Sequence, residues 1–281
     1  MKQIMKQNMK FFKNLCLWTL LLLTLTAGVF AEAADEKRTT VKVGVTGEIY
    51  QDVWGPAITE LAAEGIDLEL VSFSDYTLPN AALDAGEIDL NTFQHYNYLN
   101  NEIKTKGYKI TAIADTFLSS MSVYSKKISK LSELKEGDKI AIPNDVINTG
   151  RALLVIQGAG VIELDPSKGN TPETTDITAN PLKIEFVPVD AAQVPSLLPD
   201  VAAGVVNGGY ALDFGLSPSK DAIFYDDLSF YKDKGYVNLV AARTADKDNE
   251  VYKRVVKAFH SDEVKRVLAD KFQGALLPVW E

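Results

Sequence analysis

Cysteine and histidine are scarce in this chain of 281 residues, which contains one cysteine and two histidines. The cysteine, Cys16, lies in an N-terminal stretch that we expect to be removed, so the remaining chain has no disulfide, no thiolate nucleophile and no cysteine-based metal site. The histidines, His95 and His260, are far apart in the sequence, so neither has a second histidine at metal-ligand spacing. No phosphate-binding glycine loop is present either. We therefore predict no metal, no cofactor and no catalytic residues.

The first 33 residues have the pattern of a secretory signal peptide. Four lysines precede an uncharged apolar run from Leu15 to Phe30, and Ala31-Glu32-Ala33 follows as a cleavage pattern of small residues. A transmembrane anchor is the rival interpretation, but it needs about 20 apolar residues and this run is shorter. We therefore predict export, with cleavage after Ala33 and a periplasmic or other extracytoplasmic location.

Basic residues are in the minority. The predicted signal peptide carries four lysines and one glutamate, so the 29 basic and 38 acidic residues of the whole chain fall to 25 and 37 after cleavage. A net charge near −12 argues against nucleic acid, which is bound by clustered Lys and Arg, and against an anionic membrane surface. The binding partner that composition favours is a small molecule rather than a polyanion.

Beyond the leader, β-branched runs alternate with segments of helical spacing. Val41–Val45 and Ile66–Phe73 flank a helical segment at Val53–Ala63, and the alternation starts again at Lys139–Ile142. Such alternation predicts an α/β fold with largely parallel sheets. Two series of similar length predict two lobes.

The predicted lobes are discontinuous in the sequence. We place residues 34–118 and 236–281 in the first lobe and residues 119–235 in the second, with the chain crossing near Phe117–Val123 and Phe224–Val237. Ligands of such folds bind at the carboxyl ends of strands, where loops of both lobes meet. The junctions between strands and helices are therefore the places to look for function.

Two junctions of the first lobe are aromatic. Tyr76 follows a strand and could present its ring to a ligand, or could simply pack in a loop. Phe93, His95 and Tyr98 follow the next strand, and the last two are three residues apart, so they can face the same way on a helix. The alternative for His95 is a cap of that helix with only internal hydrogen bonds.

Two junctions of the second lobe are polar. We expect Asn148 to cap a helix, whose free N–H groups and dipole suit a carboxylate, and Arg151 to emerge one turn later with a guanidinium for the same group. The alternative is a surface Arg151 paired with Asp145. Asn207 ends a buried strand before two glycines and could hydrogen-bond a ligand, or could form only a turn.

From about Thr40 to the C-terminus, the chain resembles the NlpA/MetQ family of methionine-binding proteins. The resemblance depends on five stretches in the same order along the chain. They are Phe73-Ser74-Asp75-Tyr76 with Pro79-Asn80, Asp89 to His95 with Tyr98-Leu99, Pro143-Asn144-Asp145 with Asn148 to Arg151, Val205-Val206-Asn207-Gly208, and Thr244 to Lys247. The phrase F-Q-H-x-x-Y-L followed by P-N-D-x-x-N-x-x-R is the most specific part.

The resemblance implies a type II periplasmic binding fold, with two Rossmann-like lobes joined by two crossing strands. It implies a non-enzymatic, monomeric protein that closes around methionine, or a related amino acid or dipeptide, and delivers it to the permease of an ABC importer. By motif, Arg151 would hold the ligand carboxylate, and Asn148 and Asn207 would contact the polar ends of the ligand. The residues that would line the side-chain pocket are Tyr76, Phe93, His95, Tyr98 and Tyr210.

Three positions depart from the family pattern. Members are usually lipoproteins with a cysteine just after the apolar run, whereas Cys16 lies at the start of this run, so we predict a protein without a lipid anchor. Gly150 and Gly209 stand where we expect larger side chains, so we predict a pocket that admits a larger ligand, such as a methionine-containing dipeptide. Two alternatives stay open: an enzyme on the same fold that uses His95 with Asp115 or a serine, and an exported adhesin or sensor not coupled to transport.

Overall fold

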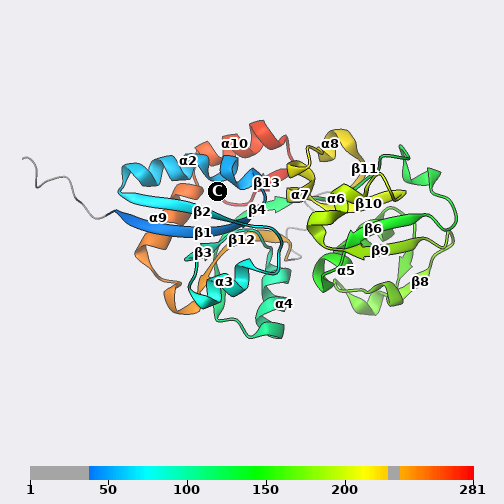
Figure 1. Cartoon of the computed structure of the whole chain (residues 1–281), viewed down its shortest axis with the longest axis horizontal. Coiled ribbons are helices and arrows are strands. Elements are labelled where there is room, and N and C mark those ends of the chain that lie inside the picture. Colours follow the sequence, from blue (N-terminus) through cyan, green and yellow to red (C-terminus); the bar gives the residue numbers. More distant parts are fainter. Residues whose placement is uncertain (1–37, 227–234) are drawn as a thin grey trace, which may run out of the picture. The chain divides into compact units, whose positions relative to one another are not determined.

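Two large sheets, each covered by helices, form the framework of the part of the chain that the structure describes. The structure is a computed structural model that describes residues 38–226 and 235–281. The signal peptide predicted for residues 1–33 lies outside these residues. The predicted α/β fold with two lobes is confirmed, because each sheet has its own helices and its own buried core (Figure 1).

The first lobe contains a six-stranded sheet in the order β13-β4-β12-β3-β1-β2. Its strands are β1 (Thr39–Thr46), β2 (Ile66–Phe73), β3 (Leu90–Asn91), β4 (Ile110–Ser119), β12 (Val237–Arg243) and β13 (Leu276–Pro278). β1 and β3 are parallel, whereas β12 is antiparallel to both of its neighbours, β3 and β4. The C-terminal part of the chain therefore returns to the lobe in which it began.

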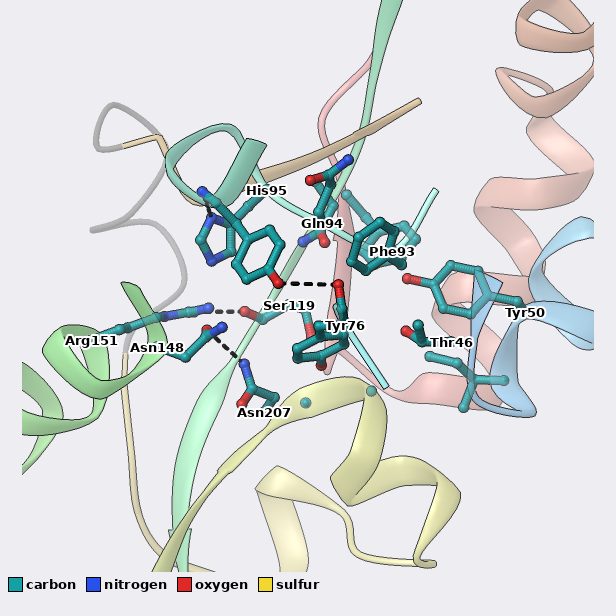
Figure 2. Close-up of a pocket in the computed structure, with 16 residues that line it drawn as sticks. Thr46, Tyr50, Tyr76, Phe93, Gln94, His95, Ser119, Asn148, Arg151 and Asn207 are labelled. Atoms are coloured by element: carbon teal, nitrogen blue, oxygen red, sulfur yellow. Dashed lines mark hydrogen bonds between the residues drawn. The ribbon is translucent and has the colours of Figure 1, made fainter. Parts of the chain in front are cut away.

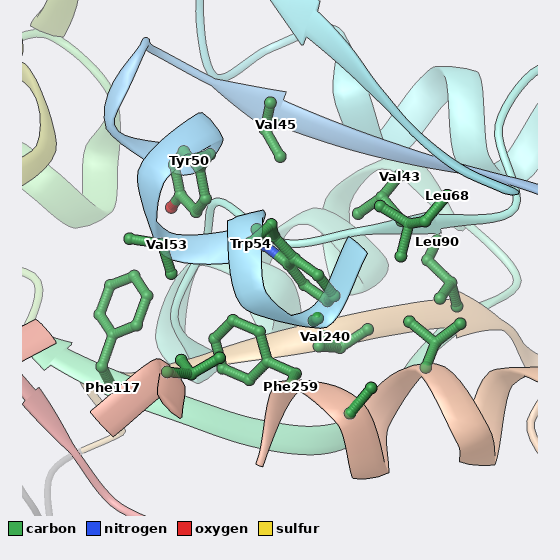
Figure 3. Close-up of a cluster of buried hydrophobic side chains, with 14 of the residues drawn as sticks. Val43, Val45, Tyr50, Val53, Trp54, Leu68, Leu90, Phe117, Val240 and Phe259 are labelled. Carbon is green, nitrogen blue, oxygen red and sulfur yellow. The ribbon is translucent and has the colours of Figure 1, made fainter. Parts of the chain in front are cut away.

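Helices cover both faces of the first sheet (Figure 1). One face carries α2 (Ile49–Ala63), α9 (Glu250–Phe259) and α10 (Asp262–Phe272), and the other carries α3 (Pro79–Ala85) and α4 (Tyr96–Lys106). The centre of the first face is the ring of Trp54, fully buried against Phe259 with 4.5 Å between ring centroids (Figure 3). Because aromatic pairs of this kind bury large apolar areas, they hold α2 and α9 to the sheet.

The second lobe contains a five-stranded sheet in the order β11-β5-β10-β6-β9. Its strands are β5 (Met121–Tyr124), β6 (Lys139–Pro143), β9 (Glu185–Val189), β10 (Ala203–Asn207) and β11 (Ala222–Tyr225), and β7 (Glu163–Leu164) pairs separately with β8 (Ile177–Ala179). Its helices are α5 (Val146–Gly158), α6 (Val194–Leu197), α7 (Gly208–Asp213) and α8 (Pro218–Asp221). α5 follows β6 and α7 follows β10, so both helices begin at the carboxyl ends of neighbouring parallel strands.

Two local predictions in this lobe are wrong. Asn148 does not cap α5, because Asp145 accepts the hydrogen bond from the Asn148 amide at 2.9 Å and the helix begins at Val146. Aspartate is as good an N-cap residue as asparagine, so the choice of Asp145 places the helix start three residues before the predicted one. The alternative of a turn at Asn207-Gly208 is also wrong, because Gly208 is the first residue of α7.

The chain passes between the lobes from Ser119, at the end of β4, to Met121, at the start of β5. The second predicted crossing, Phe224–Val237, includes residues 227–234, which lie outside the described residues. The proposed lobe boundaries at 118/119 and 235/236 stay a prediction. Within residues 38–226 and 235–281, no helix combines the length and the apolar character that a membrane span requires.

Candidate functional site

A cavity of about 40 Å³ lies where the carboxyl ends of strands from both lobes meet (Figure 2). Thr46 ends β1, Ser119 ends β4 and Asn207 ends β10, and all three line the cavity. The other lining residues are Ile49, Tyr50, Tyr76, Phe93, Gln94, His95, Tyr98, Phe117, Asn148, Arg151, Gly208, Gly209 and Asn238.

One wall of the cavity is aromatic. The Tyr76 ring lies between Phe93, at a centroid distance of 5.8 Å, and Tyr210 of the second lobe, at 4.8 Å. The Tyr98 ring meets Phe93 edge-on at 6.0 Å, and its hydroxyl donates to the Tyr76 carbonyl at 3.1 Å. This hydrogen bond ties the loop that carries Tyr76 to α4. The wall offers faces and edges that suit an apolar or thioether side chain.

A buried amide network lies behind the aromatic wall. The Asn80 and Gln94 side chains exchange two hydrogen bonds, at 2.8 and 2.6 Å, and each also bonds the Asn91 side chain. Asn80 and Asn91 have no exposed surface. Because buried polar networks of this kind lock side-chain positions, the network fixes the turn from β3 into α4, from which Phe93 and His95 project.

His95 caps α4 and also lines the cavity, so the two interpretations of this residue do not exclude each other. Its Nδ1 accepts from the Tyr98 amide at 3.2 Å, which places the proton of the neutral ring on Nε2. Burial, and then the Arg151 charge, lower the pKa of His95 to about 3. The ring is therefore neutral near pH 7, and its Nε2–H has no hydrogen-bond partner among the described residues.

Arg151 is 2% exposed, so the alternative of a surface arginine is wrong. The guanidinium donates from Nη2 to the Ser119 carbonyl at 2.8 Å and lies 4.7 Å from the centroid of the Tyr236 ring. Burial lowers the pKa of Arg151 to about 10, so the group stays positive at neutral pH. Asp226 contributes a negative charge near this cation. A guanidinium that lines a cavity also suits an anionic group of a ligand, because it can donate parallel hydrogen bonds to a carboxylate.

Three polar side chains of the second lobe form a line towards the cavity. The Asp145 carboxylate accepts from the Asn148 amide nitrogen Nδ2 at 2.9 and 3.1 Å. The Asn148 carbonyl Oδ1 accepts from Asn207 Nδ2 at 2.9 Å (Figure 2). Asn207 Oδ1 is buried and has no partner among the described residues. The cavity therefore has a hydrogen-bond acceptor in the same lobe as its cation.

A carboxylate joins the two lobes beside the cavity. Asp213, at the end of α7, accepts hydrogen bonds from the Glu48 and Ile49 amides at 3.0 and 2.9 Å, at the start of α2. Gly47 has φ = 98° and makes this approach possible, because a Cβ on Gly47 would collide with the carboxylate. The contact supplies α2 with the acceptor that its own N-cap residue, Glu48, does not provide.

Seven of the eight residues predicted to bind a ligand line this cavity, namely Tyr76, Phe93, His95, Tyr98, Asn148, Arg151 and Asn207. The eighth, Tyr210, is not in the lining and packs behind Tyr76. The sequence reasoning missed the other lining residues. Two of them could have been found from the sequence, because Thr46 directly follows a predicted strand and Gln94 directly precedes His95. No sequence pattern pointed to Asn238.

The expectation that Gly150 enlarges the pocket is wrong. Gly150 does not line the cavity, and a Cβ there would lie 2.8 Å from the Asn170 carbonyl and 2.9 Å from Thr171 Cα. Residues 170–172 pack against Gly150, so the small size of this glycine serves packing. Gly209 does line the cavity, and a Cβ there would meet only Ile49, at 3.7 Å.

The comparisons with known proteins point to one family. Residues 41–280 match the family model described as NlpA lipoprotein. The chain is 43% identical over 251 residues to the D-methionine-binding lipoprotein MetQ of Salmonella typhimurium, a match that covers 88% of this chain and 91% of that protein. It is 41% identical over 254 residues to outer membrane lipoprotein 3 of Mannheimia haemolytica, covering 90% and 95%.

Solved structures agree with the sequence comparisons. A nutrient-binding protein from Burkholderia cenocepacia, solved with methionine bound, has a TM-score of 0.79 and 42% identity, with 85% of this chain and all of that chain covered. A crystal structure of the methionine-binding protein MetQ has a TM-score of 0.82 and 41% identity, covering 86% and 98%. Among the described residues, no group of three or more His, Cys, Asp or Glu is placed to hold a metal ion.

Proposed function

The chain belongs to the NlpA lipoprotein family and has the type II periplasmic binding fold, and from that premise we propose that it captures methionine, or a related amino acid or dipeptide, between its lobes. The captured solute is then delivered to the permease of an ABC importer. We further propose that the protein works outside the cytoplasm as a monomer. We propose that it has no lipid anchor, because Cys16 lies at the start of the apolar run of the leader and not just after it.

The observation that carries the proposal is the buried Arg151 guanidinium beside the buried acceptor Asn207 Oδ1. A zwitterionic amino acid has the complementary pair, a carboxylate for the cation and an ammonium for the acceptor. The aromatic wall suits its side chain, since each sulfur–aromatic contact is worth roughly 0.3–1.5 kcal/mol. Asn148 lies beside both groups and completes the polar end of the site.

The lining of the cavity supports binding by closure of the lobes. Tyr76 and His95 of the first lobe line the same cavity as Arg151 and Asn207 of the second, so a ligand that touches both sets is enclosed when the lobes come together. The ligand then stabilises the closed arrangement by its higher affinity for it, and the importer recognises that arrangement. The boundaries 34–118 with 236–281, and 119–235, describe the two parts that we propose move.

The chemistry of His95 supports binding rather than turnover. A general base acts best when its pKa lies near the working pH, whereas burial and Arg151 hold the pKa of His95 at about 3. Asp115, the partner considered for it, accepts from the Tyr96 hydroxyl at 2.6 Å instead. We therefore propose that His95 donates a hydrogen bond from Nε2 to a bound ligand and takes no part in catalysis.

Replacement of Arg151 by alanine tests the proposal. Removing one partner of a buried charge pair costs about 3–5 kcal/mol, so Arg151→Ala should weaken methionine binding by roughly two to four orders of magnitude in calorimetry. Arg254→Ala is the matched control, because Arg254 pairs with Glu64 on a half-exposed surface away from the cavity. Equal affinity of Arg151→Ala and Arg254→Ala for methionine would overturn the proposed function.

A thermal-shift screen identifies the ligand among the candidates. A ligand at 100 times its Kd adds about 2.7 kcal/mol to the free energy of unfolding, which is a measurable rise in melting temperature. We expect methionine or a methionine-containing dipeptide to give the largest shift among amino acids and short peptides. A larger shift with an unrelated solute would replace methionine in the proposal and leave the binding role intact.

A further inference from the structure

Asp145, Asn148 and Asn207 form a directional chain of hydrogen bonds. All three side chains belong to the second lobe, at the start of α5 and the end of β10, so their arrangement does not depend on how the lobes meet. Asn148 and Asn207 line the cavity, whereas Asp145 does not. Asn207 is 8% exposed and Asn148 is 1% exposed, so neither amide can exchange its protein partner for bulk water at little cost.

The chemistry of Asp145 sets the direction of the whole chain. An ionised carboxylate only accepts hydrogen bonds, so Asn148 must turn its NH2 group towards Asp145, which the two contacts at 2.9 and 3.1 Å show. The Asn148 carbonyl then faces Asn207 and accepts from its NH2 group at 2.9 Å. The Asn207 carbonyl is left as the free end of the hydrogen-bond chain, buried and without a partner among the described residues, on a residue that lines the cavity.

We propose that Asp145 is a positioning residue that, through Asn148, holds Asn207 with its acceptor towards the ligand and so makes the site selective for a hydrogen-bond donor at that point. This inference rests on the proposed function, in which the donor is the α-ammonium of an amino acid. An acceptor in the same place, such as a keto oxygen, would face the Asn207 carbonyl and would be rejected. The selectivity for an amino group is therefore set by a residue outside the cavity.

Asp145 also caps α5, and a purely structural cap is the competing explanation. The two roles respond differently to Asp145→Asn. Asparagine is as good an N-cap as aspartate, so the helix is preserved. The amide group of the substituted side chain can donate to the Asn148 carbonyl. The Asn148 side-chain amide can then rotate by half a turn, and the Asn207 amide can follow it. The Asn207 NH2 group would then face the cavity.

The test uses two probes without charge at the α position, the 2-hydroxy and 2-oxo analogues of methionine. Both keep the carboxylate and the thioether, but only the hydroxy analogue can donate a hydrogen bond at the α position. We expect the unaltered chain to bind the hydroxy analogue at least about tenfold more tightly than the oxo analogue. In Asp145→Asn that ratio should fall to about one or invert. A loss of charge alone leaves the ratio unchanged, because neither probe carries charge there.

Asp165→Asn is the matched control, because Asp165 caps a short helix of the same lobe on the exposed surface and does not line the cavity. It should keep the unaltered ratio. If Asp145→Asn does not fold, Asp145→Ser keeps an N-cap but is too short to hold the Asn148 amide, and the ratio should again fall towards one. An unchanged ratio in the folded Asp145 variant overturns the inference.

Failure of the proposed function has a different signature. If the chain binds neither methionine nor either analogue, the proposed ligand is wrong. The orientation of the amides is then checked without ligand, by neutron diffraction on the deuterated protein. Deuterons on the Asn207 nitrogen that point at Asn148 support the positioning role of Asp145. An Asn207 carbonyl that points at Asn148 refutes it.

Discussion

Replacement of Asp213 should alter the contact between the lobes without altering the lining of the cavity. Its carboxylate, in the second lobe, accepts from the Glu48 and Ile49 amides of the first lobe, so the two hydrogen bonds exist only while the lobes are together. Asp213 does not line the cavity. Asp213→Ala removes the acceptor and leaves two amides at the start of α2 to water or to no partner.

The expected size of the effect follows from helix capping. Loss of an N-cap acceptor costs about 0.5–2 kcal/mol, and here the cost falls on the closed arrangement alone. Because tenfold in Kd corresponds to about 1.4 kcal/mol, Asp213→Ala should weaken binding by about 2- to 30-fold. The factor should be the same for every ligand that the closed lobes hold, since Asp213 touches none of them.

Asp213→Asn should behave differently from Asp213→Ala. Burial, aided by the charge of Glu48, disfavours the negative charge of Asp213 and raises its pKa, whereas the two backbone hydrogen bonds lower that pKa. Asparagine keeps an acceptor without that charge, and we expect affinity within about twofold of the unaltered chain.

Calorimetry with methionine and a weaker analogue, together with dissociation rates from stopped-flow measurements, checks both Asp213 variants. We expect faster dissociation in Asp213→Ala for both ligands by one common factor. The reasoning fails if Asp213→Ala binds as tightly as the unaltered chain, or if it weakens one ligand and not the other. The second result would mean that Asp213 affects the cavity directly.

Two further predictions concern stability. Burial lowers the pKa of His95 to about 3 in the folded chain, whereas the unfolded chain takes up this proton below about pH 6.5. The contribution of His95 to the free energy of unfolding is therefore highest above about pH 6.5. It should fall towards pH 3 by up to about 1.4 kcal/mol per pH unit. Urea titrations of the unaltered chain and His95→Asn check this, and parallel pH profiles would contradict it. Gly150→Ala should destabilise the fold by about 1–3 kcal/mol without changing ligand preference, because its Cβ meets backbone atoms of Asn170 and Thr171. Gly209→Ala should leave the urea midpoint nearly unchanged and weaken bulky ligands, and the reverse pattern would refute both assignments.

The alternation of strands and helices was determined by the sequence alone, because it depends on residues that are close along the chain. Ile66–Phe73 was predicted with the bounds that the structure has, and the end of β10 at Asn207 was predicted as a junction. Carboxyl ends of parallel strands gather at one edge of a sheet, so polar and aromatic residues after several strands were expected to meet. Seven of the eight predicted residues line one cavity for this reason.

Local spacing did not determine which neighbour each side chain has. Asparagine is a residue type that often caps helices, yet the cap of α5 is Asp145. The side chain of Asn148 bonds Asn207 instead, 59 residues away. Tyr210 was predicted to line the pocket, yet its ring packs against Tyr76 and it is not among the lining residues.

Contacts between distant segments were decided only by the tertiary structure. The packing of 170–172 against Gly150, the approach of Asp213 to α2 and the contact of Arg151 with Ser119 each join parts of the chain that share no local pattern. The sequence by itself therefore determined the architecture and the kinds of side chain at the site. The direction of its hydrogen bonds and the contact that closes the lobes follow from three-dimensional packing, because each needs a partner that local periodicity does not specify.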